Sequence, residues 1–141
     1  MSINVENIEG EFDSAYRTAE EIRTIIDPVG SAAMGVCLDA GHAHMSDVSV
    51  AGMVRELGRD LREVHFHDNL GKADRHRVVG VGSIDWVDVI RALDEINYRS
   101  PIVFEWCGTY WSDIPFVDIA RGHYFNWRQF EAMAEAIRTG K

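Results

Sequence analysis

The sequence predicts an α/β fold of four strand–helix units, arranged as half of a parallel (β/α) barrel with its helices on one face of the sheet. Two observations support this. Short strand-like segments alternate with amphipathic helical segments along all 141 residues, and repeated units of this kind build parallel sheets. The predicted strands are also apolar on one face only, whereas a doubly wound sheet needs both faces apolar. We expect a single domain over residues 1–141.

The first unit begins at once. Residues 3–8 alternate apolar and polar side chains, as a half-buried strand does. Thr18 and Glu21 have the spacing of a capping box, which predicts a helix over 19–27. Pro28 is expected to stop that helix, because proline lacks a backbone N–H.

The second and third units repeat the pattern. A strand is predicted over 34–39, and a helix capped at Ser49 is predicted to end at Gly58. The third strand is predicted over 63–68, and a long loop then leads to a helix capped by Asp85. Both helices place apolar residues at i, i+3, i+4 and i+7: Val50, Met53, Val54 and Leu57 in one, and Trp86, Val89, Ile90 and Leu93 in the other.

The fourth unit has a strand over 101–105. An aromatic segment over 110–127 is interpreted as a loop, and its aromatic side chains as core or interface rather than as a cofactor site. The final helix carries an apolar stripe of Phe130, Met133, Ala134 and Ile137.

The two faces of the predicted sheet differ in character. One face is wholly apolar and should pack on the helices: Ile3, Val5, Val36, Leu38, Val64, Phe66, Ile102 and Phe104. The other is mainly polar or small: Asn4, Glu6, Gly35, Cys37, Asp39, Glu63, His65, His67, Val103 and Glu105. A barrel interior with a functional mouth tolerates such a polar face.

Four ligand-type side chains fall at the carboxyl ends of these strands, one from each: Glu6, Asp39, His65 and Glu105. Barrel active sites are built at that end. Carboxylates brought together repel one another unless a cation lies between them. Three carboxylates and one imidazole suit Mn²⁺, Mg²⁺, Co²⁺ or Zn²⁺, so we predict one divalent metal ion at this place.

Three further residues are candidates for binding substrate or a second metal. His42 lies three residues after Asp39, at the start of the following loop. Asp74 and His76 are two apart on the third loop. Their spacing fits two interpretations equally well. Both side chains point into the mouth of the barrel, or both lie in a surface turn.

Composition excludes several classes of function. The net charge of −9 argues against a nucleic-acid surface, which depends on clustered Lys and Arg. The sequence shows no apolar run long enough for a membrane span and no signal-peptide pattern, so we expect a cytoplasmic protein. Cys37 and Cys107 form no metal motif by spacing and are interpreted as reduced and buried.

Six stretches together resemble the xylose-isomerase-like TIM barrels, a superfamily that includes sugar isomerases, sugar 3-epimerases and endonuclease IV. The motifs Leu-Asp-x-Gly-His and His-x-His-Asp are the most specific of them. The stretches are 5–7, 35–43, 65–69, 74–76, 80–86 and 102–105. The family barrel has eight units, so the resemblance identifies this chain as the C-terminal half.

The resemblance implies a metal-dependent sugar isomerase or epimerase that acts on a small sugar or polyol. Glu6, Asp39, His65 and Glu105 match the family's metal quartet, and His42 matches a residue that contacts substrate. Glu6 and Glu105 would exchange a proton next to a ketose carbonyl through an enediolate. Two alternatives stay open. One is a zinc phosphodiesterase like endonuclease IV, with His42, Asp74 and His76 as additional zinc ligands. The other is a half barrel without catalytic activity.

Self-association is the last expectation. A barrel has no sheet edges, but four strands leave two exposed. Two copies related by a two-fold axis would cover them, with the aromatic segment as contact surface. We therefore predict a homo-oligomer, and a dimer in particular.

Overall fold

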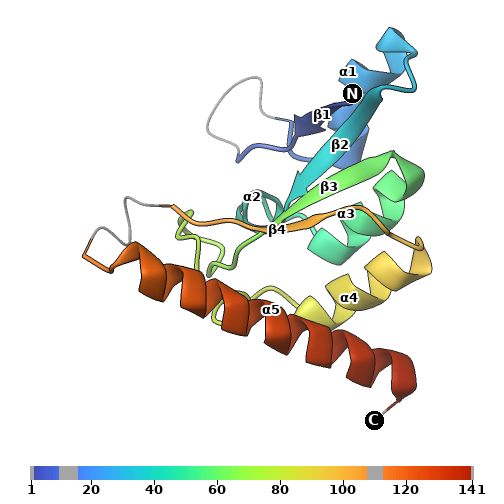
Figure 1. Ribbon diagram of the computed structural model, residues 1–141. Coiled ribbons are helices and arrows are strands. Elements are labelled where there is room, and N and C mark those ends of the chain that lie inside the picture. Colours follow the sequence, from blue (N-terminus) through green and yellow to red (C-terminus); the bar gives the residue numbers. More distant parts are fainter. Residues whose placement is uncertain (1, 10–15, 108–112, 141) are drawn as a thin grey trace.

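The computed structural model describes residues 2–9, 16–107 and 113–140. Four parallel strands form one open sheet in the order β1-β2-β3-β4. The strands are β1 (Ile3–Glu6), β2 (Met34–Asp39), β3 (Leu61–Phe66) and β4 (Ile102–Phe104). The helices are α1 (Ala19–Val29), α2 (Ala40–Met45), α3 (Val50–Leu57), the short 3₁₀ turn η1 (Gly58–Asp60), α4 (Trp86–Glu95) and α5 (Phe116–Thr139). The described chain thus follows the predicted order of four strand–helix units and confirms the half barrel (Figure 1).

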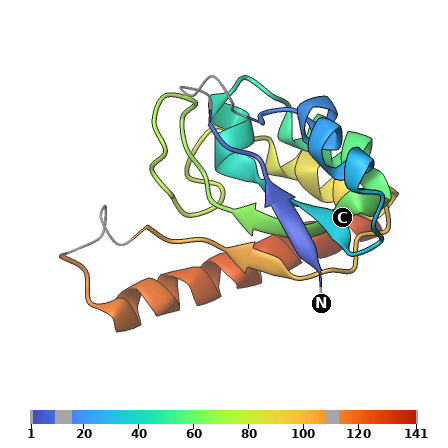
Figure 2. The same cartoon turned by 90° about the horizontal axis from the view of Figure 1, so that it is seen from above.

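The core lies between the apolar face of the sheet and the helices, which cover one side of it (Figure 2). The two inner strands bury their outward side chains: Val36, Leu38, Val64 and Phe66. The ring of Phe66 packs edge-on against Trp86, with ring centroids 4.9 Å apart, and it also contacts Phe130 of α5. On the edge strands the same face is less covered, since Ile3 is 61% exposed and Ile102 is 37% exposed.

Local capping explains where most helices begin. Thr18 and Glu21 form the predicted capping box at the start of α1. Ser49 accepts a hydrogen bond from the Gly52 N–H at the start of α3, and Asp85 accepts one from the Asp88 N–H at the start of α4.

Several predicted boundaries were wrong. Helix α1 continues through Pro28 to Val29 and stops at Gly30, which adopts the left-handed conformation with φ 61°. Strand β3 begins at Leu61, directly after η1, and ends at Phe66, two residues before the predicted end at 68. Much of the predicted aromatic loop is helical, because α5 begins at Phe116. Tyr110 and Trp111 lie outside the described residues.

Helix α2 was not predicted. It follows β2 without a connecting loop, because Asp39 ends the strand and caps the helix by accepting the His42 N–H at 2.7 Å. Six residues are too few to show a helical period of apolar side chains. The consequence for function is that His42 is held on a helix rather than on a loop.

Both edges of the sheet are open in the described chain, since β1 pairs only with β2 and β4 only with β3. The first turns of α5 project beyond the sheet (Figures 1 and 2). Large apolar side chains are exposed there: Phe116, Val117, Tyr124, Phe125 and Trp127. Among the described residues, no helix is both long and apolar enough to cross a membrane.

Candidate metal centre

The predicted quartet comes together at the carboxyl end of the sheet. The parallel register pairs Asp39 of β2 with His65 of β3, and Glu6 ends the neighbouring strand β1. Glu105 directly follows β4, where its N–H donates to the Phe66 carbonyl at 3.1 Å. One ligand atom from each of these four side chains lies within 4.8 Å of the others. The structure therefore brings the four together on one face, as the alternation of side chains predicted.

The centre of this quartet is His65. Its Nδ1 atom lies 3.6 Å from Glu6 Oε1 and 3.4 Å from Glu105 Oε2. Both His65 Nδ1 and Glu105 Oε2 are buried atoms without a hydrogen-bond partner. Buried polar atoms normally have a hydrogen-bond partner. The lack of one at both His65 Nδ1 and Glu105 Oε2 fits a positively charged group bound between these two atoms. A divalent cation fits the donor set of three carboxylates and one imidazole.

The raised pKa of Glu6 also fits a cation bound among these carboxylates. Burial raises the pKa of Glu6, and the negative charges of Asp39 and Glu105 raise it further, although His65 and His42 act in the opposite direction. A cation among these carboxylates would remove that repulsion.

Asp39 is the most firmly held member. It is fully buried, and its backbone N–H and C=O both bond the side chain of Asn7, at 2.7 and 2.9 Å. Its carboxylate lies 3.0 Å from His67 Nε2 through each oxygen. Burial alone would raise the pKa of Asp39, but His67 and His42 outweigh it and lower the pKa. The carboxylate is therefore ionised and fixed in orientation.

A second group of ligand-type side chains adjoins the quartet. Asp74 Oδ2 lies 2.8 Å from His76 Nε2 and 3.8 Å from His42 Nε2, and Asp74 Oδ1 lies 3.6 Å from His67 Nδ1. The rings of His67 and His76 are stacked, with centroids 3.9 Å apart. The structure thus places His42, Asp74 and His76 together beside the quartet rather than in a surface turn.

The charges within this second group reinforce one another. Burial disfavours the ion of Asp74, but the nearby His42 and the hydrogen bond with His76 hold the pKa of that carboxyl well below its usual range. Burial likewise disfavours the His42 cation, yet Asp74 and Asp39 raise the pKa of His42 to about 9. His42 is therefore a cation at neutral pH when no metal is bound.

The loop that carries Asp74 and His76 is anchored by Asp68. The backbones of Asp68 and Arg77 form two hydrogen bonds of 2.8 Å with each other. The Asp68 carboxylate also accepts the Trp86 indole N–H at 2.7 Å and the Gly80 N–H at 2.9 Å. These bonds make the loop a fixed support for the second group.

Sequence reasoning missed three residues of this region. His67 was placed on the inner face without a role, yet it bonds Asp39 and faces Asp74. Asn7 was quoted only as part of a motif, although it holds the Asp39 backbone. Cys37 was interpreted as a buried thiol, and it also lies beside Glu6 and His65. The alternation that selected Asp39 and His65 could also have selected Cys37 and His67, which are two residues away.

Two curated proteins with similar sequences are both named D-psicose 3-epimerase. D-psicose 3-epimerase from Enterocloster bolteae is 33% identical over 88 residues, which are 62% of this chain and 28% of that protein. D-psicose 3-epimerase from Agrobacterium fabrum is 34% identical over 88 residues, 62% of this chain and 29% of that protein. The chain spans well under half the length of these curated relatives.

Solved structures agree on the fold. The crystal structure of a D-tagatose 3-epimerase-like protein superposes with a TM-score of 0.79 at 24% identity, covering 99% of this chain and 49% of that one. An L-ribulose 3-epimerase superposes with a TM-score of 0.74 at 19% identity, again over 99% of this chain and 49% of that one. The model of the xylose isomerase-like TIM barrel family matches residues 1–136. The chain therefore belongs to the xylose isomerase-like TIM barrel family.

Proposed function

We propose that this chain is the metal-binding C-terminal half of a ketose 3-epimerase-like enzyme, which moves a proton next to the carbonyl of a small sugar. The observation that supports the proposal is the convergence of Glu6 and Glu105 on His65 Nδ1 from opposite edge strands, at 3.6 and 3.4 Å. The relatives named as D-psicose 3-epimerases add support for the substrate class.

Glu6, Asp39, His65 and Glu105 would hold the divalent cation. When bound, such a cation polarises a carbonyl oxygen and makes the neighbouring C–H more acidic. Mn²⁺, Mg²⁺, Co²⁺ and Zn²⁺ all suit this donor set.

The protein's own groups carry the proton. Glu6 ends β1 and Glu105 follows β4, so in this proposal a sugar carbon would have one carboxylate on each side. One carboxylate would remove the proton, and the other, which starts protonated, would deliver its own proton to the opposite face of the resulting enediolate. Delivery to the opposite face inverts the carbon, which is what a 3-epimerase does. In this proposal His42, whose Nε2 lies 3.8 Å from Asp74, would donate a hydrogen bond to a sugar oxygen.

Proton exchange tests this proposal. The chain is incubated with Mn²⁺ and a panel of ketoses in deuterated water, and loss of the proton at carbon 3 is followed by NMR. We expect exchange with at least one ketose, and we expect Glu6→Gln and Glu105→Gln to abolish it. Glu135→Gln is the control, because Glu135 is exposed on α5 and belongs to none of the groups of metal-ligand-type side chains in the described chain. Absence of exchange with every sugar would refute the proposal and leave a half barrel without catalytic activity.

We also propose that the chain acts as a homo-oligomer, most simply a dimer. The open edges of β1 and β4 and the exposed apolar side chains of α5 support this. Sedimentation equilibrium at micromolar concentration should give twice the monomer mass of 15.9 kDa. A stably folded monomer would show that the half barrel needs no second copy.

One observation favours a second candidate function. His42, Asp74 and His76 lie together beside the quartet, and additional zinc ligands at these positions suit a phosphodiesterase of the endonuclease IV kind. The net charge of −9 counts against a nucleic-acid substrate. Elemental analysis separates the two functions, because two or more zinc ions per chain favour the phosphodiesterase and one ion favours the epimerase.

A further inference from the structure

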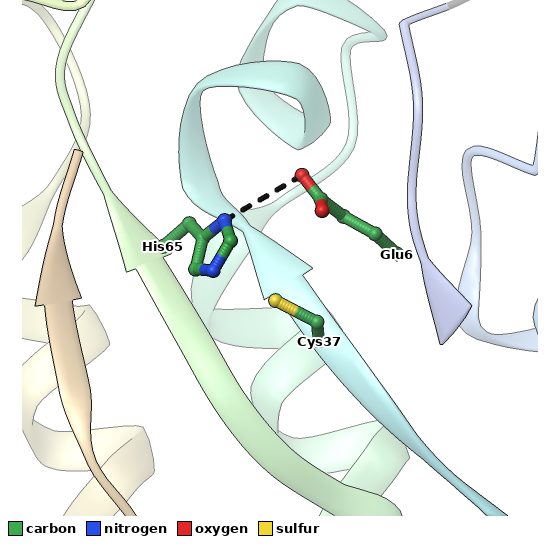
Figure 3. Close-up of side chains that lie close together, drawn as sticks. All are labelled: Glu6, Cys37 and His65. Atoms are coloured by element: carbon green, nitrogen blue, oxygen red, sulfur yellow. Dashed lines mark ion pairs between the residues drawn. The ribbon is translucent and has the colours of Figure 1, made fainter. Parts of the chain in front are cut away.

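The fold brings a cysteine to the edge of the metal quartet. Cys37 of β2 lies opposite Glu6 of β1 in the parallel register, and on β3 it pairs with Glu63, two residues before His65 (Figure 3). One ligand atom from each of Glu6, Cys37 and His65 lies within 4.8 Å of the other two. These three side chains offer one oxygen, one sulfur and one nitrogen donor around a common position.

The contacts of this trio suit a metal ion. Glu6 Oε1 and His65 Nδ1 are 3.6 Å apart, close to the separation of two ligands that are each about 2.0–2.2 Å from one tetrahedral zinc ion. His65 Nδ1 is buried without a hydrogen-bond partner. Cys37 is 3% exposed, and no hydrogen bond engages its sulfur within the described part of the chain. A hydrogen bond therefore does not explain why a cysteine stands at this position. A small apolar side chain would fill the same space.

We propose that Glu6, Cys37 and His65 form a second, sulfur-containing metal site that takes a soft or borderline divalent cation such as Cd²⁺ or Zn²⁺. Thiolate ligands select such cations, whereas the oxygen-rich quartet of Glu6, Asp39, His65 and Glu105 also suits Mn²⁺ and Mg²⁺. The fourth position is open to water, and Glu63, which lies 3.5 Å from His65 Nε2, contacts the other ring nitrogen.

The two sites share two ligands, and this has a functional consequence. Because Glu6 and His65 belong to both, two cations would need the same two side chains at once, so we infer that the sites compete. A soft cation drawn to Cys37 therefore displaces Mn²⁺ from the quartet and separates Asp39 and Glu105 from the metal. Cys37 thus makes the centre sensitive to thiophilic metals. This part of the inference builds on the quartet of the proposed function, but metal binding at Cys37 does not require catalysis.

The thiol itself is protonated before a cation arrives. Burial raises the pKa of Cys37, and the charges of Glu6 and Glu63 raise it further. A bound cation takes the thiolate, and the thiol proton leaves to solvent.

Cobalt absorption tests the site directly. The full chain is titrated with Co²⁺, and thiolate coordination is detected by its sulfur-to-cobalt charge-transfer band in the near ultraviolet. We expect the band in the wild type and in Cys107→Ser, which removes the other free cysteine, and we expect no band in Cys37→Ser. A band that is absent from the wild type, persists in Cys37→Ser or disappears in Cys107→Ser overturns the proposal.

A second measurement keeps Cys37 in place, so its result does not depend on whether the Cys37→Ser chain folds. X-ray absorption at the zinc edge is recorded on the Cys107→Ser chain loaded with one Zn²⁺. We expect one sulfur neighbour at about 2.3 Å. A coordination shell of only nitrogen and oxygen contradicts the assignment.

Competition separates this site from the quartet. In the wild type, Cd²⁺ should displace Mn²⁺ one for one, and Cys37→Ser should weaken Cd²⁺ binding by at least about tenfold with Mn²⁺ binding unchanged. Glu105→Gln should do the reverse, since Glu105 belongs only to the quartet: it weakens Mn²⁺ binding and keeps the cobalt band. A band lost in Glu105→Gln would overturn the separate site, whereas intact Mn²⁺ binding in Glu105→Gln would count against the proposed function alone.

Discussion

Gly41 of α2 is the position where a single methyl group should damage the metal centre most. A Cβ atom built on Gly41 would lie 1.9 Å from His67 Cε1 and 2.5 Å from His67 Nδ1. The His67 ring has little freedom to move away, because it bonds Asp39 at 3.0 Å and stacks on His76 at 3.9 Å. Gly41→Ala should therefore displace His67 from both partners.

The size of the effect follows from those contacts. Forcing an extra methyl group into a packed interior costs about 1–3 kcal/mol, and losing a buried hydrogen bond to a charged group costs about 1.5–3 kcal/mol. The free energy of unfolding should thus fall by about 2.5–6 kcal/mol, a large part of the ~5–15 kcal/mol of an ordinary domain. Asp39 also loses the partner that orients it, so Mn²⁺ affinity should fall about 10–100-fold.

Urea denaturation and calorimetric Mn²⁺ titration measure these two quantities. Gly122→Ala is the matched control, because a Cβ at Gly122 of α5 meets no atom within 4 Å and alanine should stabilise the helix by about 1 kcal/mol. In a His67→Ala background the ring is gone, so Gly41→Ala should hardly change the free energy of unfolding. A Gly41→Ala chain as stable as the wild type, or equal costs in both backgrounds, would refute the reasoning.

Three further predictions concern the supports of the site. Asn7→Ala should lower the free energy of unfolding by about 1.5–4.5 kcal/mol in urea denaturation, because it leaves the Asp39 N–H without a partner and removes a second hydrogen bond to the Asp39 C=O. Trp86→Phe should cost about 1.5–3 kcal/mol by removing the indole N–H that Asp68 accepts, whereas Trp127→Phe, on a side chain that is 40% exposed, should cost much less. Stability in chelator should fall as the pH rises from 6.5 to about 9, because the pKa of His42 is raised in the folded state and the stabilisation from its charge is complete only below 6.5. Asp74→Asn should remove most of that fall, measured as the urea midpoint at each pH.

Much of the fold was predictable because each strand and helix carries its own local signal. The capping box of Thr18 and Glu21 and the caps at Ser49 and Asp85 lie where the sequence placed them. The alternation of side chains along the strands predicted that Glu6, Asp39, His65 and Glu105 share a face, and the register brings them together.

The remaining features depend on contacts between distant segments. Helix α2 is too short to show a period, and it forms because Asp39 caps it. The role of His67 depends on Asp39 and Asp74, which reach it from another strand and from a loop. Spacing could not decide whether Asp74 and His76 form a surface turn, because their position depends on the bonds that Asp68 makes to the far end of the loop.

Anomalous diffraction from a crystal grown with Mn²⁺ tests the central claim most directly. The quartet predicts one manganese peak with an atom of Glu6, Asp39, His65 and Glu105 each at roughly 2.0–2.6 Å. A manganese peak bound by other residues, or four side chains splayed more than about 8 Å from a shared centre, would contradict the metal quartet.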